Sequence, residues 1–167
     1  MIDRLMNAAT LLVLVLTLGV GVRVLMLFGA KSPPAVLKQG ERITSVSLGD
    51  SGAAMRKVPA ATPIAIYVFS TTCPICTEQK TRIAALLAKM PSERVITTSL
   101  ESSEKTSAYW QGALPSPTRL RSEGSAALKV VGYPYLLVIS REGKVLFSQL
   151  GKTEVTSDEL ARLLTSS

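Results

Sequence analysis

The sequence predicts an α/β domain, in which a central mixed sheet is flanked by helices, behind a single N-terminal membrane-spanning helix. Three observations lead to this prediction. The continuous apolar run from Ile64 to Phe69 is typical of a buried central strand, and two cysteines and an amphipathic helix come directly after it. A run of β-branched residues over 94–100 comes next, so that strand, helix and strand form a parallel crossover unit. An uncharged apolar stretch near the N-terminus predicts the membrane helix.

The N-terminal stretch has no charged residue from Leu5 to Val22, which is long enough to cross a bilayer. A cleavable signal peptide is the alternative, because such peptides also begin with a basic residue, here Arg4, and continue with a leucine-rich core. The apolar stretch is long for a signal peptide, and in Phe28-Gly29-Ala30 at its end a large residue stands where a cleavage site needs a small one. We therefore expect a short leader, residues 1–4, and a retained transmembrane anchor, residues 5–28.

The charges on either side of this helix bear on its orientation. Lys31, Lys38 and Arg42 come after the helix, whereas only Arg4 and the terminal amine precede it. The positive-inside tendency would then keep the domain in the cytoplasm. A single anchor with so short a leader commonly exports the domain attached to it, and we favour export.

The chain has two cysteines, three positions apart, and no histidine. Pro74 suits the first turn of a helix, which places Cys73 at the helix N-terminus and Cys76 within the first turn. Free backbone N–H groups and the positive end of the helix dipole then face the Cys73 sulfur and favour its thiolate. Cys73 is the predicted nucleophile. Cys76 shares a helix face with the apolar Ile83 and Leu87, so it is the predicted buried, resolving thiol.

Two other interpretations of the cysteine pair compete with a redox role. A structural zinc ion needs four nitrogen or sulfur ligands, and the chain offers only these two, so we expect no metal. A purely structural disulfide closing so short a loop would constrain the unfolded chain very little. A redox-active pair fits best, because such pairs stand between a strand and a helix. This chemistry needs no cofactor.

The remaining segments complete the domain. Residues 29–61 are predicted to form a linker and an N-terminal hairpin or edge strand, and residues 62–167 the main domain. Further predicted elements are short helices at 101–114 and 125–131, a buried strand at 136–139, an antiparallel strand at 145–150, and a terminal helix from 156.

The net charge of +7 raises the possibility of nucleic-acid binding. The charges are scattered along the sequence, without a basic stripe or interleaved aromatic residues. We expect a solvated surface with affinity for lipid headgroups, and no nucleic-acid partner.

The order of these elements, with Cys73-Pro74-Ile75-Cys76 and a later Tyr133-Pro134, resembles the thioredoxin fold over residues 62–167. With an anchor ahead of the domain, the chain looks like the membrane-anchored TlpA-like thiol-disulfide oxidoreductases. Within these, the segments 69–76 and 133–135 look closest to the methylamine-utilisation protein MauD. This resemblance implies a single-pass protein of the bacterial inner membrane with its C-terminal domain in the periplasm.

The resemblance also implies roles for residues around the cysteines. Pro134 would be a cis-proline packed beside them, and the backbone of Tyr133 would pair with a substrate strand. Pro74 and Ile75 would tune the redox potential. Thr72 stands where many members have a tryptophan, so the substrate-binding surface has lost an apolar side chain.

The function implied is thiol-disulfide exchange with client proteins in the cell envelope, possible clients being a periplasmic dehydrogenase or a c-type cytochrome during maturation. The partners would be disulfide-containing or dithiol clients, a transmembrane thiol electron donor or acceptor, and the bilayer around residues 5–28. The alternative is a redox-inactive, membrane-tethered module that binds or assembles clients without turnover.

Overall fold

The computed structural model describes residues 16–17, 19, 35–49, 56–114 and 118–165. The chain divides into two compact units, Met1–Ala35 and Val36–Ser167. The described residues 16–17 and 19 of the first unit are helical, and all the strands and the helices described below belong to the second. Most of the predicted anchor, residues 5–28, lies outside the described residues. Within the described residues no helix has the length and apolar character needed to cross a membrane. The anchor stays a prediction.

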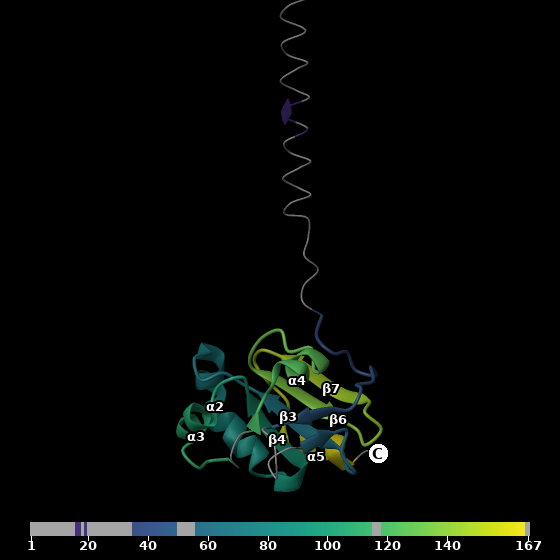
Figure 1. The fold of residues 1–167 in the computed structure, drawn as a ribbon. Coiled ribbons are helices and arrows are strands. Elements are labelled where there is room, and N and C mark those ends of the chain that lie inside the picture. The colour runs from purple at the N-terminus through teal and green to yellow at the C-terminus, as the bar shows by residue number, and fades with distance from the viewer. Residues whose placement is uncertain (1–15, 18, 20–34, 50–55, 115–117, 166–167) are drawn as a thin grey trace, which may run out of the picture. The chain divides into compact units, whose positions relative to one another are not determined.

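The second unit is built on a five-stranded mixed sheet, as predicted, with strand order β5-β4-β3-β6-β7 (Figure 1). The first three strands in this order are parallel, whereas β6 runs antiparallel to β3 and β7 antiparallel to β6. The strands are β3 (Ile64–Val68), β4 (Val95–Ser99), β5 (Thr118–Arg119), β6 (Tyr135–Ile139) and β7 (Val145–Leu150).

The central strand β3 is buried on both faces, which explains its continuous apolar sequence. Successive side chains point to opposite faces of a sheet, so Ala65 and Tyr67 enter one core cluster while Ile64, Ile66 and Val68 enter the other. Each cluster is covered by its own set of helices.

The first cluster lies under three helices, whose buried side chains include Ile83, Trp110 and Leu160. The second lies under a short helix and a small antiparallel hairpin, whose Val46 and Val58 are buried against the sheet. The helices of the first cluster are α2 (Pro74–Leu87), α3 (Ser103–Trp110) and α5 (Ser157–Thr165), and the elements over the second are α4 (Ser122–Ala127), β1 (Val46–Leu48) and β2 (Arg56–Val58); a 3-10 turn, η1 (Ser92–Arg94), precedes β4.

The segment ahead of the hairpin is part of this unit. Leu37 is buried, and its backbone N–H donates to the Tyr135 hydroxyl at 3.2 Å. Gly40 donates to the carbonyl of Val145 at 2.8 Å, which pairs the segment with the start of the edge strand β7. Of the predicted linker and hairpin at 29–61, the described residues 36–49 and 56–61 thus belong to the same unit as the sheet.

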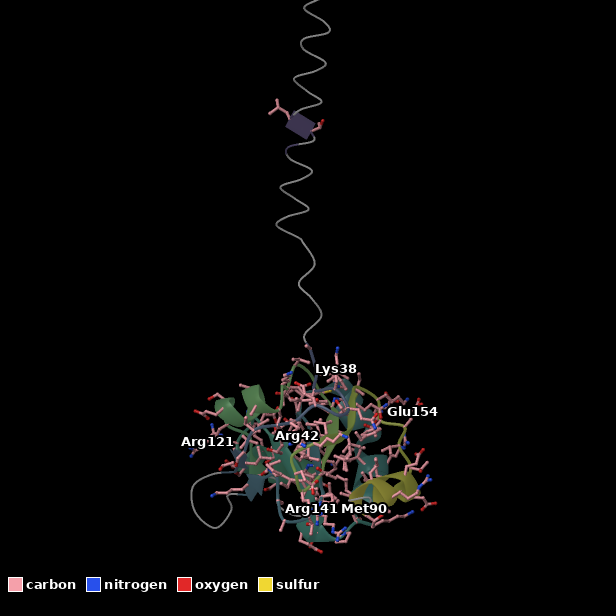
Figure 2. All side chains as sticks on the ribbon, turned by 90° about the vertical axis from the view of Figure 1, so that its right-hand side faces the viewer. Lys38, Arg42, Met90, Arg121, Arg141 and Glu154 are labelled. Atoms are coloured by element: carbon pink, nitrogen blue, oxygen red, sulfur yellow. The ribbon has the colours of Figure 1, made fainter. Side chains whose placement is uncertain are left out.

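The cations of this unit are distributed over its surface. Lys38, Arg42, Arg121 and Arg141 lie apart from one another (Figure 2). Lys129 forms an ion pair with Glu41. The positive charge is therefore spread over several elements and partly compensated.

Candidate active site

The two cysteines stand where β3 passes into α2. The helix begins at Pro74, which needs no backbone N–H partner, and Cys73 is the N-cap residue with an extended backbone (φ −79°, ψ 119°). The Cys73 Sγ accepts a hydrogen bond from the backbone N–H of Cys76 at 3.3 Å. The sulfur thus takes the position that a serine or aspartate oxygen occupies in an ordinary N-cap, and Cys73 lies at the helix N-terminus as predicted.

The two thiols differ in their exposure to solvent. Both cysteines are free; Cys73 is partly exposed, whereas Cys76 is only 1% exposed. Burial raises the pKa of the Cys76 thiol to about 12, and the adjacent Cys73 adds to this effect. Only the Cys73 sulfur is therefore accessible to a partner, and Cys76 lies behind it as a protonated thiol at neutral pH.

The loop before β6 brings Tyr133 and Pro134 to the cysteines from 60 residues along the chain. The Cys73 thiol donates to the Tyr133 carbonyl oxygen at 3.5 Å. The Tyr133–Pro134 peptide bond is cis, as the resemblance implied, and Pro134 is buried. The structure thus brings together four of the predicted site residues, and their roles in binding stay predictions.

The other predicted site residues lie on the solvent side of the same loop and helix start. Thr72, Pro74 and Ile75 are all exposed. The Thr72 hydroxyl lies 3.0 Å from the Ser70 hydroxyl, so it belongs to the hydrogen-bonded loop that leads to Cys73.

A carboxylate that the sequence did not point to holds this loop. The Ser70 hydroxyl donates to Glu101 at 2.7 Å, and the backbone N–H of Thr71 lies 3.1 Å from each Glu101 carboxylate oxygen. Partial burial alone would raise the pKa of Glu101, but the hydrogen bonds from Thr71 and Ser70 outweigh it and hold the pKa below its usual value. The only signal for Glu101 in the sequence is that an acid stands two residues after the end of β4, the strand next to β3.

Replacing Glu101 with alanine is expected to lower the free energy of unfolding by about 1–3 kcal/mol at neutral pH, because Ser70 and the Thr71 N–H lose a charged acceptor. The effect depends on pH. Since the pKa of Glu101 is lower in the folded protein than its usual 4.5, its contribution is complete above that value and is lost as the pH falls through the folded-state pKa. Denaturant titrations at neutral and acid pH measure both effects.

The matched control is Glu154→Ala, which removes an exposed carboxylate from a loop before α5 (Figure 2). We expect it to change the free energy of unfolding by less than about 0.5 kcal/mol. A Glu101 variant as stable as the control at neutral pH would show that the carboxylate does not hold the loop.

Four exposed apolar side chains lie near the end of the sheet where β3 passes into α2. The exposed large apolar side chains of the described part of the second unit are between 38% and 44% exposed, and they are Val131, Ile75, Leu150 and Leu100. Ile75 lies between the two cysteines, and Leu100 comes after the C-terminal end of β4. In the strand register, Val68 pairs with Tyr135 and Tyr135 with Leu150, so Leu150 lies at the end of the sheet where β3 ends, and Gly132, the residue after Val131, lies against Leu150. We call these four side chains the apolar rim.

Within the described residues, no three Asp, Glu, Cys or His side chains lie close enough together to hold a metal ion.

Comparison with known proteins gives matches at the level of the fold. No family model matches the chain, and no curated protein matches it in sequence. Among solved structures, the thioredoxin domain of a thiol-disulfide oxidoreductase from Bacteroides vulgatus matches with a TM-score of 0.61 at 11% identity, over 77% of this chain and 99% of that one. A putative thiol:disulfide interchange protein DsbE from Chlorobium tepidum matches with a TM-score of 0.57 at 17% identity, over 78% and 97%.

A thio-disulfide isomerase from Thermus thermophilus matches with a TM-score of 0.57 at 21% identity, over 78% of this chain and 96% of that one. Each of the three matched structures is covered over nearly its whole length. The described domain therefore has a thioredoxin-like fold. The sequence prediction of a thioredoxin-like fold is confirmed by these matches.

Proposed function

We propose that this protein is a thiol-disulfide oxidoreductase that acts on protein disulfides through Cys73 and Cys76. The observation that carries the proposal is the unequal placement of the two thiols. The Cys73 sulfur is accessible at a helix N-terminus, and Cys76 is buried one helical turn behind it. The fold neighbours named as thiol-disulfide oxidoreductases and interchange proteins support the same chemistry.

The reaction is derived from this geometry. The Cys73 thiolate attacks one sulfur of a substrate disulfide, so that a Cys73–substrate disulfide forms and the second substrate sulfur leaves as a thiolate that takes up a proton. Cys76 then attacks the Cys73 sulfur. The Cys73–Cys76 disulfide forms, the remaining substrate sulfur is released as a thiol, and the two electrons have passed from the protein to the substrate. The reverse sequence installs a disulfide.

A protein substrate fits the surface better than a small thiol does. The apolar rim is available to bury apolar side chains of a partner. The Tyr133 carbonyl accepts a hydrogen bond from the Cys73 thiol in the free protein. The same oxygen is in place to accept a hydrogen bond from a substrate backbone N–H instead.

The finer proposal is that the domain works tethered to the bacterial inner membrane, facing the periplasm, and exchanges electrons with a transmembrane thiol partner. The uncharged stretch from Leu5 to Val22 supports the tether. The resemblance to TlpA-like and MauD-like proteins supports maturation of a periplasmic dehydrogenase or a c-type cytochrome as the task.

Two measurements test the proposal. The full-length chain should accelerate the reduction of insulin disulfides by dithiothreitol, and no acceleration would overturn the exchange reaction. Alkylation of intact cells with a mass-tagged reagent, before and after a membrane-impermeant one, then tests location. Thiols that the impermeant reagent blocks place the domain outside the cytoplasmic membrane, and thiols that it fails to reach place the domain in the cytoplasm.

A further inference from the structure

Several buried polar atoms gather around α2. Among the described residues, five buried side-chain nitrogen or oxygen atoms have no hydrogen-bond partner in the protein, and they belong to Tyr67, Gln79, Tyr109, Trp110 and Thr153. Three of these side chains are aromatic and pack together on one face of the sheet. Buried polar groups in native proteins are nearly always paired, so a cluster of unpaired ones calls for an explanation.

The Tyr67 hydroxyl is the atom of this group that relates most directly to the reaction. Tyr67 and Cys76 are each only 1% exposed and belong to the same core cluster, Tyr67 from β3 and Cys76 from the first turn of α2. The ring of Tyr67 is fixed by stacking on Phe69, with centroids 6.1 Å apart, and by an edge contact with Trp110 at 6.2 Å. Burial raises the pKa of Tyr67, and the nearby Cys76 raises it further, more than Cys73 does. The hydroxyl is therefore a neutral, unpaired donor in the same core cluster as the buried thiol.

The resolution step needs such a donor. Cys76 has to attack as a thiolate, and burial opposes the formation of that charge. No Asp, Glu, Lys or Arg is buried in the described part of the chain. Within that part, no buried charged side chain is therefore present to stabilise the thiolate or to take its proton. A neutral hydroxyl that donates to the sulfur stabilises the charged form without adding a second buried charge.

We propose that the Tyr67 hydroxyl donates a hydrogen bond to the Cys76 sulfur as this sulfur becomes a thiolate and attacks the mixed disulfide. In this step the Cys76 S–H bond breaks and the Cys73–Cys76 bond forms. The bond from Cys73 to the substrate sulfur breaks, and the proton lost by Cys76 ends, through solvent, on the departing substrate thiolate. The inference rests on the proposed exchange reaction and assigns one residue to its second half.

A single experiment separates the two halves of the reaction. Reduced full-length protein is mixed with one equivalent of dithiobis(nitrobenzoate), whose coloured thiolate is released once when Cys73 attacks and again when Cys76 resolves the mixed disulfide. In Tyr67→Phe we expect an unchanged first phase and a second phase slowed about tenfold, the loss expected for one hydrogen bond to a charged atom. The free energy of unfolding, measured by the fluorescence of Trp110, should stay the same or rise, because an unpaired buried hydroxyl is removed.

The matched control is Tyr109→Phe, which removes a second unpaired buried hydroxyl from the same aromatic group. Both phases should be unchanged in this variant. An unchanged second phase in Tyr67→Phe overturns the inference, and so does a slowing of both phases together with a loss of stability, which would show a structural role. A wild-type protein without a first phase would instead overturn the proposed function itself.

Discussion

Replacing Cys73 with serine abolishes disulfide turnover while leaving the fold intact. The Cys73 sulfur is the accessible one of the two, and serine has no sulfur with which to form the mixed disulfide. Cys76, at 1% exposure, cannot take over the attack on a protein substrate. The insulin reduction assay should therefore give the rate of the uncatalysed reaction.

The fold of this variant should survive because serine is a good N-cap residue. In the wild-type protein the Cys73 sulfur accepts the backbone N–H of Cys76, and the serine oxygen is able to accept the same bond. We expect a free energy of unfolding within about 1 kcal/mol of the wild-type value. Turnover that persists in a folded Cys73→Ser protein would contradict the mechanism, whereas an unfolded variant would be replaced by Cys73→Ala.

The part of the site that is predictable from sequence is the part that local patterns determine. The run from Ile64 to Phe69 is apolar throughout because β3 is buried on both faces. Pro74 fixes the start of α2, and Cys73 becomes the N-cap in consequence. The capping box at the start of α5 is equally local, since Thr156 and Glu159 hydrogen-bond to each other.

Contacts between distant segments could not be predicted from local sequence patterns. Glu101 comes after β4, and nothing in its own neighbourhood shows that its carboxylate reaches Ser70 and Thr71. The strand β5 has two residues, too few for a periodic pattern, and it is held to β4 in part by the Thr98 hydroxyl, which donates to the Thr118 carbonyl at 2.9 Å. So short a strand forms only because β4 is already in place to pair with it.

Boundaries were the least accurate part of the prediction. The helix expected at 125–131 is α4 and begins three residues earlier, at Ser122. Gly124 within it lies against the side chains of Leu120 and Leu48, so packing against β1 decides where this helix sits. Tyr109 and Trp110 lie in α3, within the short helix predicted at 101–114, and both also belong to the aromatic group next to β3.

Replacing Cys76 with serine also lowers turnover, but unlike the Cys73 variant it accumulates a covalent complex with the substrate. Cys73 still attacks the substrate, but no second thiol is present to attack the mixed disulfide. Non-reducing electrophoresis should show the full-length chain joined to its substrate, and dithiothreitol should release it. Turnover should fall to the rate at which outside thiols resolve the complex, and the complex should be absent from the Cys73→Ser, Cys76→Ser double variant.

The burial of Cys76 also determines how the pH dependence of the resolution step differs between the wild type and this variant. In the wild type, burial raises the pKa of Cys76 to about 12, so the thiolate fraction, and with it the rate of resolution, rises with pH throughout the neutral and alkaline range. The variant lacks this titrating group, and its release should depend on the pKa of the added thiol. A serine hydroxyl in this buried position lowers the free energy of unfolding by about 1–3 kcal/mol. Cys76→Ala therefore serves as the control, because it traps the mixed disulfide without burying a hydroxyl. A Cys76→Ala protein that turns over at the wild-type rate would show that resolution does not depend on the buried thiol.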